Sequence, residues 1–427
     1  MRSLLLSPLR SPVTSTITIP GSKSYTNRAL LLAALTTTPV EIQHPLLSDD
    51  TRAMIACLRD LGIEIVVDRD SILVRGSIED VKEGGYTLHA DLSANVIRFL
   101  LPLLCIVPGI KILRGGEGLN KRPIDELVCG LRQLGANITY LDREGYPPLQ
   151  IASSRLQSRP ITIQGGISSQ YLSALLMIAP MIGGLTIRVE GTQVSRPYLE
   201  MTIESMRQFG VEVEQQDGAI YHVAGGQTYC CTCYSVEGDF SSAGYLFAIA
   251  ALTRSTVTLE NLNPTSVQAD RRLLDVLAVM GNTITYGERS ITMIGKQIQP
   301  MQLEMLDFPD QAQTLAVLLA FAQGESSLTG LQSLRFKETD RLKATAQELC
   351  KMGISTTWTE NMLTLVGGVP HAASIATYGD QRMAMAFAVA GSELEGMTIQ
   401  DPSVVNKTFP AFWEKLQQLG IGVQEVV

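Results

Sequence analysis

The sequence has little charge and no apolar run long enough to cross a membrane. Only 18% of its 427 residues are charged and 45% are hydrophobic, which excludes a disordered or solvating chain. The longest apolar stretch, residues 172–187, is interrupted by Pro180 and two glycines and is shorter than the roughly 20 residues of a membrane span. The leucine run at residues 4–6 is too short for the core of a signal peptide. We therefore expect a folded cytoplasmic protein with no membrane partner.

The sequence also lacks the positive charge that is typical of nucleic-acid binding. Its 34 Lys and Arg residues stand against 42 Asp and Glu residues, so the formal net charge is -8. A nucleic-acid-binding protein shows the opposite balance, and we expect small-molecule partners instead. The length exceeds what one ordinary hydrophobic core holds, so the chain is expected to form two domains.

Cysteine and histidine are too scarce and too scattered to predict a disulfide framework or a metal site. The seven cysteines are an odd number spread over a long chain, which suits a reducing compartment. Cys230, Cys231 and Cys233 are close in sequence, but no second cysteine pair or histidine pair follows at zinc spacing, and His222 stands alone. We expect a turn or strand with buried thiols there, and no metal.

Two interleaved series of helix signals repeat through the whole chain. In the first, a glycine follows an amphipathic helical pattern every 67–75 residues and precedes a short strand-like run. Glycine at that place suits the left-handed residue that ends many helices. A second series of helices, described next, keeps a similar period, and two such series indicate a true internal repeat. The six glycines are Gly62, Gly135, Gly210, Gly281, Gly353 and Gly420.

The second series consists of helices that are apolar on all sides, which is typical of buried helices. Each unit of about 70 residues thus holds one buried helix, one amphipathic outer helix and several strands, and six units fill the chain. We predict two similar α/β domains of three units each: residues 20–238, and residues 1–19 plus 239–427, with hinges near 19–20 and 237–239. The buried helices begin near Ser22, Ser93, Ser168, Ser241, Asp310 and Asp380.

The buried helices begin with residues that suit anions. A helix N-terminus carries unpaired N–H groups and a partial positive charge, and therefore binds anions. Residues 22–24 open the first buried helix, with Arg28 one turn on, and residues 168–170 open the third. Simple N-capping by serine explains any single start. Lys23 and Arg28 beside Ser24 favour an anion pocket at the first.

A set of cations with two acids lies elsewhere at junctions between loops and helices, where sites are usually assembled. Each alone is explained as a solvated charge. Together they suit a pair of anionic substrates and acid–base chemistry. The set is Arg122, Lys337, Arg341, Arg382, Lys407, Asp310 and Glu338.

These segments resemble the EPSP synthases, the 3-phosphoshikimate 1-carboxyvinyltransferases of the enolpyruvyl transferase family. The resemblance spans essentially the whole chain in order, and its most specific parts are GSKSYTNRA at 21–29 and KETDRL at 337–342. Further matches are KRPI at 121–124, SSQYLSALL at 168–176, EGDFSSAGY at 237–245, FPDQAQTLAV at 308–317, DQRMAM at 380–385 and NKTFP at 406–410.

The resemblance implies a fold and a reaction. Each domain would have three βαβαββ-type repeats around buried parallel helices, an inside-out α/β barrel, with the active-site cleft between the domains. The enzyme would transfer the enolpyruvyl group of phosphoenolpyruvate to the 5-hydroxyl of shikimate 3-phosphate through a tetrahedral intermediate, and then release phosphate. It would act as a monomer in the shikimate pathway of aromatic amino acid biosynthesis, and it would need no metal or organic cofactor.

The resemblance also implies roles for individual residues. Asp310 would take the 5-hydroxyl proton, and Glu338 and Lys23 would transfer protons at the methylene carbon and the bridging oxygen. The first domain would be the shikimate 3-phosphate side. Shikimate 3-phosphate would be bound by Ser24, Arg28, Ser168, Ser169, Gln170, Ser195, Tyr198 and Lys337. Phosphoenolpyruvate would be bound by Lys23, Ala94, Arg122, Gln170, Arg341, Arg382 and Lys407.

The sequence departs from the family around the second buried helix. Where the family opens that helix with Gly-Asn-Ala-Gly-Thr, this chain has residues 91–95, so Asp91 and Ala94 replace glycines. Gln381 replaces a family histidine. These departures keep two alternatives open: a paralogue of the same fold with another cyclic substrate, and a noncatalytic binding protein. The branch that acts on UDP-N-acetylglucosamine uses a loop cysteine, and residues 115–120 contain none.

Overall fold

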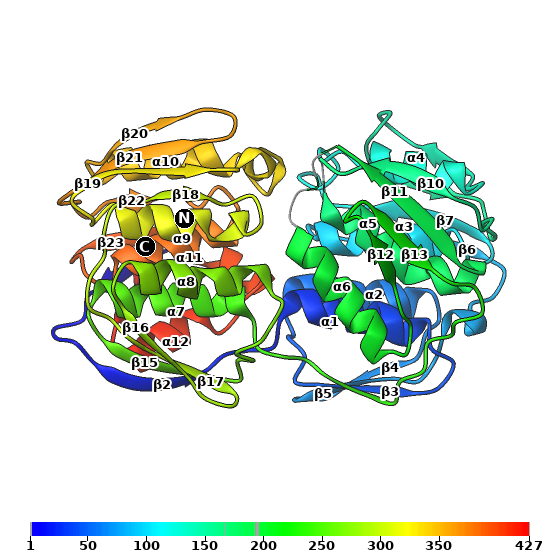
Figure 1. Ribbon diagram of the computed structural model, residues 1–427, viewed down its shortest axis with the longest axis horizontal. Helices are drawn as coiled ribbons and strands as arrows, with labels where there is room; N and C mark the ends of the chain where they lie inside the picture. The colour runs from blue at the N-terminus through cyan, green and yellow to red at the C-terminus, as the bar shows by residue number, and fades with distance from the viewer. Residues whose placement is uncertain (1, 167, 192, 194–195, 427) are drawn as a thin grey trace. The chain divides into compact units, whose positions relative to one another are not determined.

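The chain forms two compact units in the computed structural model, which describes residues 2–166, 168–191, 193 and 196–426. Unit 1 comprises Met1–Pro20 and Glu237–Val427, and unit 2 comprises Gly21–Val236. Each unit contains three four-stranded sheets (Figure 1). Unit 2 is therefore one continuous segment, whereas unit 1 is made from both ends of the chain.

Unit 2 is built from three repeats of the order strand, buried helix, strand, outer helix, strand, strand. The first repeat is β14 (Cys233–Ser235), α1 (Lys23–Ala34), β3 (Val40–Gln43), α2 (Asp49–Asp60), β4 (Ile65–Val67) and β5 (Ser71–Val74). The second is β6 (Gly85–His89), α3 (Ala94–Leu104), β7 (Ile110–Arg114), α4 (Asp125–Gln133), β8 (Ile138–Tyr140) and β9 (Leu149–Ile151). The third is β10 (Ile161–Gln164), α5 (Ser169–Ile178), β11 (Leu185–Glu190), α6 (Arg196–Gln208), β12 (Glu214–Gln216) and β13 (Ile220–Val223).

Unit 1 has the same order of elements in its three repeats. The first is β2 (Thr14–Thr18), α7 (Phe240–Leu252), β15 (Thr256–Glu260), α8 (Arg272–Val279), β16 (Thr283–Tyr286) and β17 (Ser290–Ile294). The second is β18 (Gln302–Glu304), α9 (Ala312–Leu319), β19 (Gly324–Thr329), α10 (Arg341–Lys351), β20 (Ser355–Trp358) and β21 (Leu363–Gly367). The third is β22 (Ser374–Ile375), α11 (Gln381–Ala390), β23 (Met397–Gln400), α12 (Phe412–Leu419), β24 (Gly422–Val426) and β1 (Ser3–Ser7).

All six sheets share one pairing pattern. The strands on either side of a buried helix pair in parallel, and the remaining two strands add in antiparallel fashion. In one sheet, β2 lies parallel to β15 with Ile17 opposite Leu259. A parallel pair needs a crossover connection, and the buried helix provides it. The predicted α/β fold of repeated βαβαββ units is therefore confirmed.

The glycine series marks the ends of the outer helices, as predicted. The backbone φ angles of all six glycines lie between 82° and 105°, in the region that costs other residues energy because of their Cβ atom. The chain can therefore turn directly from each outer helix into the next strand. This conformation explains why glycine recurs with the period of the repeat.

The buried helices form the centre of each unit because they are apolar on all sides. In unit 1, α7, α9 and α11 pack against one another, and in unit 2, α3 packs against both α5 and α1. Figure 1 shows the sheets of unit 1 around α7, α9 and α11. No helix in the described part of the chain is long and apolar enough to span a membrane.

The buried helices of unit 1 begin close to the predicted positions. The helix expected near Ser241 begins at Phe240 with Asp239 as its N-cap. The helix expected near Asp310 begins at Ala312, directly after the 3₁₀ turn η4 (Pro309–Gln311) that contains Asp310. Cys230 and Cys233 are exposed, so the expected buried thiols are absent there. All seven cysteines are free thiols.

Candidate active site

In unit 2, Lys23 stands in the first turn of the buried helix α1. Its Nζ lies 3.2 Å from Oδ2 of Asp50, at the start of α2. Both side chains are largely buried, with 17% and 5% of their surface exposed. The carboxylate therefore holds the ammonium group close to the N-terminal end of α1, beside Ser24.

Arg28 is the most deeply buried cation of the predicted unit 2 site, with 1% of its surface exposed. Its guanidinium donates to Thr202 Oγ1 at 2.7 Å and to the carbonyl oxygens of Ser24 at 2.9 Å and Tyr198 at 2.8 Å. Burial lowers the pKa of Arg28 to about 10. Because a pKa of about 10 is still well above neutral pH, Arg28 keeps its positive charge, and its hydrogen bonds fix the backbone at two predicted ligand residues.

Gln170 joins the third buried helix of unit 2 to the second. Its Nε2 donates to Asn95 Oδ1 at 2.5 Å, and its Oε1 accepts from Arg98 Nη1 at 2.8 Å. The Arg98 guanidinium also lies over the ring of Tyr171, 5.1 Å from its centroid. Arg98 is absent from the sequence prediction, although it follows Asn95 by three residues on α3. That spacing puts both side chains on one helix face.

The serines of the predicted unit 2 site are partly committed to capping. Ser168 is the N-cap of α5, and its Oγ accepts from the backbone N–H of Gln170 at 3.3 Å. Ser169 is buried, and Tyr198 lies on α6 with its carbonyl bound to Arg28. Ser195 lies outside the described residues. The Ser168 oxygen also lies 3.5 Å from Nη1 of Arg98, so this serine connects the start of α5 to α3.

The altered segment before α3 adopts an unusual backbone conformation. Asp91 has a φ of 47°, in the left-handed region, and its carbonyl accepts from the backbone N–H of Gly116 at 2.6 Å. Asp91, a non-glycine residue, thus occupies a conformation that favours glycine. Ala94 is the first residue of α3 and is half-buried.

The predicted phosphoenolpyruvate ligand Arg122 is buried in the segment between β7 and α4.

In unit 1, Arg341 is the centre of a network of ion pairs. It is the first residue of α10 and only 2% of its side chain is exposed. Its guanidinium binds Asp380 at 2.7 Å, Glu338 at 2.7 Å and Asp310 at 3.0 Å. Burial alone would lower the pKa of Arg341, but these three carboxylates raise it. Arg341 is thus a permanent cation.

Asp310 is shared among three cations. Its Oδ1 lies 3.0 Å from Arg341 and 3.2 Å from Lys337, and its Oδ2 lies 3.2 Å from Arg382. Burial favours the protonated acid, yet Arg382, Lys337 and Arg341 together hold the pKa of Asp310 well below its usual range. Burial lowers the pKa of Lys337, and Asp310 partly opposes that shift. The carboxylate is therefore ionised throughout the neutral range.

Glu338, Arg382 and Lys407 complete the network, which we call the Arg341 cluster. Lys407, at the end of the 3₁₀ turn η6 (Pro402–Lys407), binds the Glu338 carboxylate through its Nζ. Arg382, on α11, donates to Tyr245 Oη and Ser241 Oγ, both at 3.3 Å. The Arg341 cluster comprises Asp310, Lys337, Glu338, Arg341, Asp380, Arg382 and Lys407.

Six of these seven residues are predicted from the sequence as site residues. The seventh, Asp380, is predicted only as the start of a buried helix. Asp380 caps α11 by accepting from the backbone N–H of Arg382 at 2.8 Å, and it also binds Arg341. Its position directly before Gln381 and Arg382 is a signal that sequence reasoning missed. Gln381 is buried, and its Oε1 has no hydrogen-bond partner among the described residues. Four separate segments thus bring four cations and three carboxylates together.

The chemistry of the Arg341 cluster is that of anion binding and proton transfer. Four cations suit phosphate and carboxylate groups, because charge-assisted hydrogen bonds from arginine and lysine are strong. Asp310 and Glu338 are carboxylates, a residue type that serves in acid–base chemistry. Within the described residues, no three His, Cys, Asp or Glu side chains form a group that could hold a metal ion.

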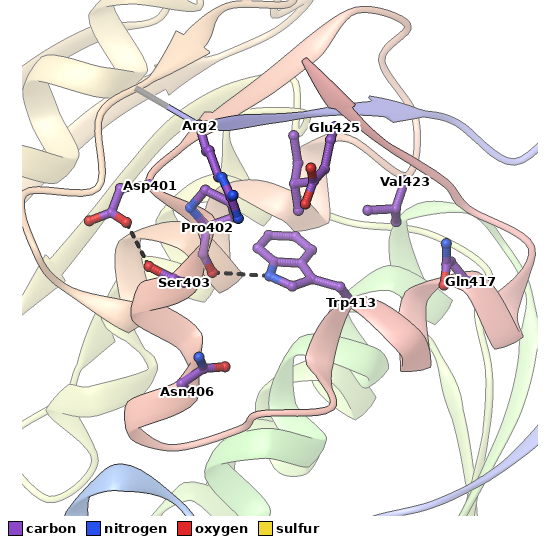
Figure 2. Close-up of a pocket in the computed structure, with 10 residues that line it drawn as sticks. Arg2, Asp401, Pro402, Ser403, Asn406, Trp413, Gln417, Val423 and Glu425 are labelled. Atoms are coloured by element: carbon purple, nitrogen blue, oxygen red, sulfur yellow. Dashed lines mark hydrogen bonds between the residues drawn. The ribbon is translucent and has the colours of Figure 1, made fainter. Parts of the chain in front are cut away.

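A separate cavity of about 600 Å³ lies in unit 1 and contains none of the predicted site residues (Figure 2). Trp413 stands in it, and the indole N–H donates to the carbonyl of Pro402 at 3.1 Å. Beside it, the Ser403 hydroxyl donates to Asp401 at 2.8 Å. Most of the other lining residues are exposed, among them Arg2, Asn406 and Glu425. The predicted chemistry therefore does not lie in this cavity.

Comparison with known proteins identifies one family. Residues 9–416 match the model of the family described as EPSP synthase (3-phosphoshikimate 1-carboxyvinyltransferase). A 3-phosphoshikimate 1-carboxyvinyltransferase of Sulfurovum sp. (strain NBC37-1) is 39% identical over 427 residues, covering 98% of this chain and 99% of the relative. The enzyme of that name from Yersinia pseudotuberculosis serotype O:3 (strain YPIII) is 39% identical over 425 residues, with the same coverage.

The fold is similar to that of solved enzymes as well. An EPSP synthase structure from Acinetobacter baumannii at 2.37 Å superposes with a TM-score of 0.83 at 24% sequence identity, over 100% of both chains. A second EPSP synthase structure from Acinetobacter baumannii gives a TM-score of 0.81 at 25% identity, again over 100% of both chains.

Proposed function

Because the chain belongs to the EPSP synthase family, we propose that it transfers the enolpyruvyl group of phosphoenolpyruvate to the 5-hydroxyl of shikimate 3-phosphate and releases phosphate. The observation that carries the proposal is the Arg341 cluster, which joins four cations to two candidate acid–base groups at the positions that match the family's motifs. Neither the family model nor the relatives support a paralogue with another substrate or a noncatalytic binding protein.

The two substrates are assigned to different sets of residues. Shikimate 3-phosphate is bound through Ser24, Arg28, Ser168, Ser169, Gln170, Ser195, Tyr198 and Lys337. Phosphoenolpyruvate is bound through Lys23, Ala94, Arg122, Gln170, Arg341, Arg382 and Lys407. The enzyme acts in the cytoplasm as a monomer and needs no cofactor. Unit 2 carries most of the residues of the shikimate 3-phosphate set, and Lys337 comes from unit 1.

In the addition step, the 5-oxygen of shikimate 3-phosphate forms a bond to C2 of phosphoenolpyruvate. Asp310 takes the hydroxyl proton, and Glu338 delivers a proton to the methylene carbon, which gives the tetrahedral intermediate. In the elimination step, Glu338 takes a proton back from the methyl group, and the bond from C2 to the phosphate oxygen breaks. Lys23 supplies the proton at that bridging oxygen, so phosphate leaves as a weaker base.

Asp310 is a poor base in the ligand-free arrangement, because three cations hold its pKa well below the usual range. An anionic substrate changes this balance. Phosphate and carboxylate groups bind the same cations, and each cation that turns to the substrate stabilises the Asp310 carboxylate less. Substrate binding therefore raises the pKa of Asp310 toward a value suited to proton transfer.

A coupled phosphate-release assay tests the proposal. Phosphate should appear only when shikimate 3-phosphate and phosphoenolpyruvate are both present, and the enol ether product should form in equal amount. Reactions that omit either substrate are the controls. A protein that binds shikimate 3-phosphate but releases no phosphate above the omission controls would be a binding protein, and the proposed activity would be wrong.

A further inference from the structure

Asp270 is a buried acid outside the Arg341 cluster that the reaction described above does not use. It lies in the 3₁₀ turn η3 (Ala269–Arg271), and 3% of its surface is exposed. Its Oδ2 accepts a hydrogen bond from the Ser241 hydroxyl in the first turn of α7. Its Oδ1 is buried and has no hydrogen-bond partner among the described residues.

Ser241 connects Asp270 to the Arg341 cluster. The Ser241 hydroxyl donates to Asp270, so its lone pairs face other donors, and Arg382 Nη2 lies 3.3 Å from Ser241 Oγ. The same Nη2 lies 3.2 Å from Asp310 Oδ2. Asp270 and Asp310 therefore act on one guanidinium, the first through a hydroxyl and the second directly.

A purely structural role explains Asp270 poorly. A buried carboxylate with one oxygen unpaired carries a desolvation cost that an apolar or amide side chain would avoid. Burial raises the pKa of Asp270 to about 6, and Arg382 opposes that shift while Asp310 and Asp239 add to it. The neighbouring arginines are directed elsewhere, since Arg271 binds the carbonyl of Pro264 and Arg272 binds Asp307.

We propose that Asp270 is a positioning residue that orients Arg382 through Ser241 and takes up a proton when phosphoenolpyruvate binds. The proposal rests on the proposed function, in which Arg382 binds phosphoenolpyruvate. An anion at Arg382 adds a negative charge near two carboxylates that already share this cation. Oδ1 of Asp270 accepts one proton from solvent, which removes one of those charges. The proton returns to solvent when phosphate leaves.

Asp270→Asn tests the charge, because the amide oxygen still accepts from Ser241 while the titrating group is gone. The KM for phosphoenolpyruvate is measured from pH 5 to pH 8.5 with saturating shikimate 3-phosphate. The wild-type KM, divided by that of the variant, should rise from about 1 at pH 5 to as much as about tenfold at pH 8, the effect of a coupling of one pKa unit. The phosphate ionisation of the substrate is common to both enzymes and cancels in the ratio.

Asp275→Asn is the matched control, since Asp275 is an exposed acid on the adjacent helix α8. Its KM should follow that of the wild type at every pH. A ratio between wild type and Asp270→Asn that stays constant over the whole range, with an active wild type, overturns the proposal. An inactive wild type instead overturns the proposed function, so the two failures are distinguishable.

Two further measurements test the proposal even if Asp270→Asn is inactive. Infrared difference spectra between pH 8 and pH 5 should show a band of a protonated, buried carboxyl in the wild type and in Asp275→Asn, and none in Asp270→Asn. Ser241→Ala removes the connection and should raise the KM for phosphoenolpyruvate about threefold to tenfold, as expected for the loss of one ordinary hydrogen bond. Its KM for shikimate 3-phosphate should stay within about twofold. An unchanged KM for phosphoenolpyruvate in Ser241→Ala overturns the positioning role.

Discussion

The two units hold their buried cations in different ways. In unit 2, Arg28 binds one hydroxyl and two carbonyl oxygens, and Lys111 donates to three carbonyl oxygens, each at 2.7 Å. In unit 1, Arg341 and Arg382 bind carboxylates. Neutral acceptors leave the positive charge uncompensated, whereas carboxylates neutralise it and compete with an incoming anion. Anion binding in unit 1 therefore requires an exchange of partners and depends on pH more strongly.

The Lys23–Asp50 pair is the exception within unit 2, because a carboxylate lies 3.2 Å from that ammonium group. Lys23 is also the one residue of unit 2 to which the proposed mechanism gives a proton transfer. In both units, pairing of a cation with a carboxylate thus coincides with the proposed acid–base chemistry.

The largest expected effect comes from removing the carboxylate that three cations share. Asp310→Asn should lower kcat by about 10²–10⁴-fold, the usual scale for a general acid or base. Steady-state kinetics with both substrates check the value. Asp307→Asn, which breaks a partly exposed pair with Arg272 at 2.6 Å, is the control and should stay within about twofold of wild type. A kcat for Asp310→Asn within tenfold of wild type would remove the base from the proposed mechanism.

Asp270→Asn should change stability in a way that depends on pH. The folded-state pKa of about 6 exceeds that of an unfolded aspartate, so the wild type loses stability as pH rises from about 4 to 6, and the full loss is present above that range. Urea unfolding at pH 8 should give the variant a free energy of unfolding higher by up to about 3 kcal/mol. The two proteins should converge near pH 4. An equal difference at both pH values would show that Asp270 does not titrate with a raised pKa.

In unit 2, Arg28→Lys separates charge from geometry. Lysine keeps the positive charge but cannot donate to Thr202, Ser24 and Tyr198 in the fixed fork that arginine provides. The free energy of unfolding should fall by about 1–3 kcal/mol, and the KM for shikimate 3-phosphate should rise. The effect on KM should be the same at pH 6 and pH 8. A strong pH dependence in this variant would contradict the contrast between the units.

The smallest expected effect concerns the segment before α3. Asp91 occupies the left-handed region at φ 47°, where Asp91→Ala should cost about 1–2 kcal/mol. Asp91→Gly removes that strain and should be more stable than the wild type by up to about 0.5–1 kcal/mol. The melting temperatures of the wild type and the two variants, measured by thermal unfolding, check this order of stability. If alanine were as stable as glycine here, the conformation of this turn would differ from that in the structure.

Repetition made most of the fold predictable from the sequence. Six glycines with positive φ angles and six apolar helices recur with one period. The preference of glycine for helix ends and of apolar helices for the interior predicts the place of each of them. The number of strands supplied by the N-terminal segment is less apparent. The sequence assigns residues 1–19 to the second domain but does not predict that they form two strands, β1 and β2, which join different sheets. Pairing between strands hundreds of residues apart leaves no local pattern.

The candidate site was predictable where motifs carry it and not where packing alone does. Asp380, Arg98 and Asp270 were missed as site residues because their partners are distant in sequence: Arg341, Gln170 and Ser241, respectively. Spacing along one helix does not reveal a contact between two helices. Asp380 had a local signal, its position as a helix cap beside Arg382, whereas Asp270 had none.

The division of the chain between the units sets an order for folding during synthesis. All strands of unit 2 lie between residues 40 and 235, so this unit can close its three sheets once Val236 has left the ribosome. Strand β2 must wait for β15, some 240 residues later, and β1 must wait for β23 and β24 near the C-terminus. Contacts of such long range are slow to form because loop closure costs entropy. Strands β1 and β2 therefore stay unpaired while the whole of unit 2 is translated, and β24 completes the sheet of β1 more than 400 residues later.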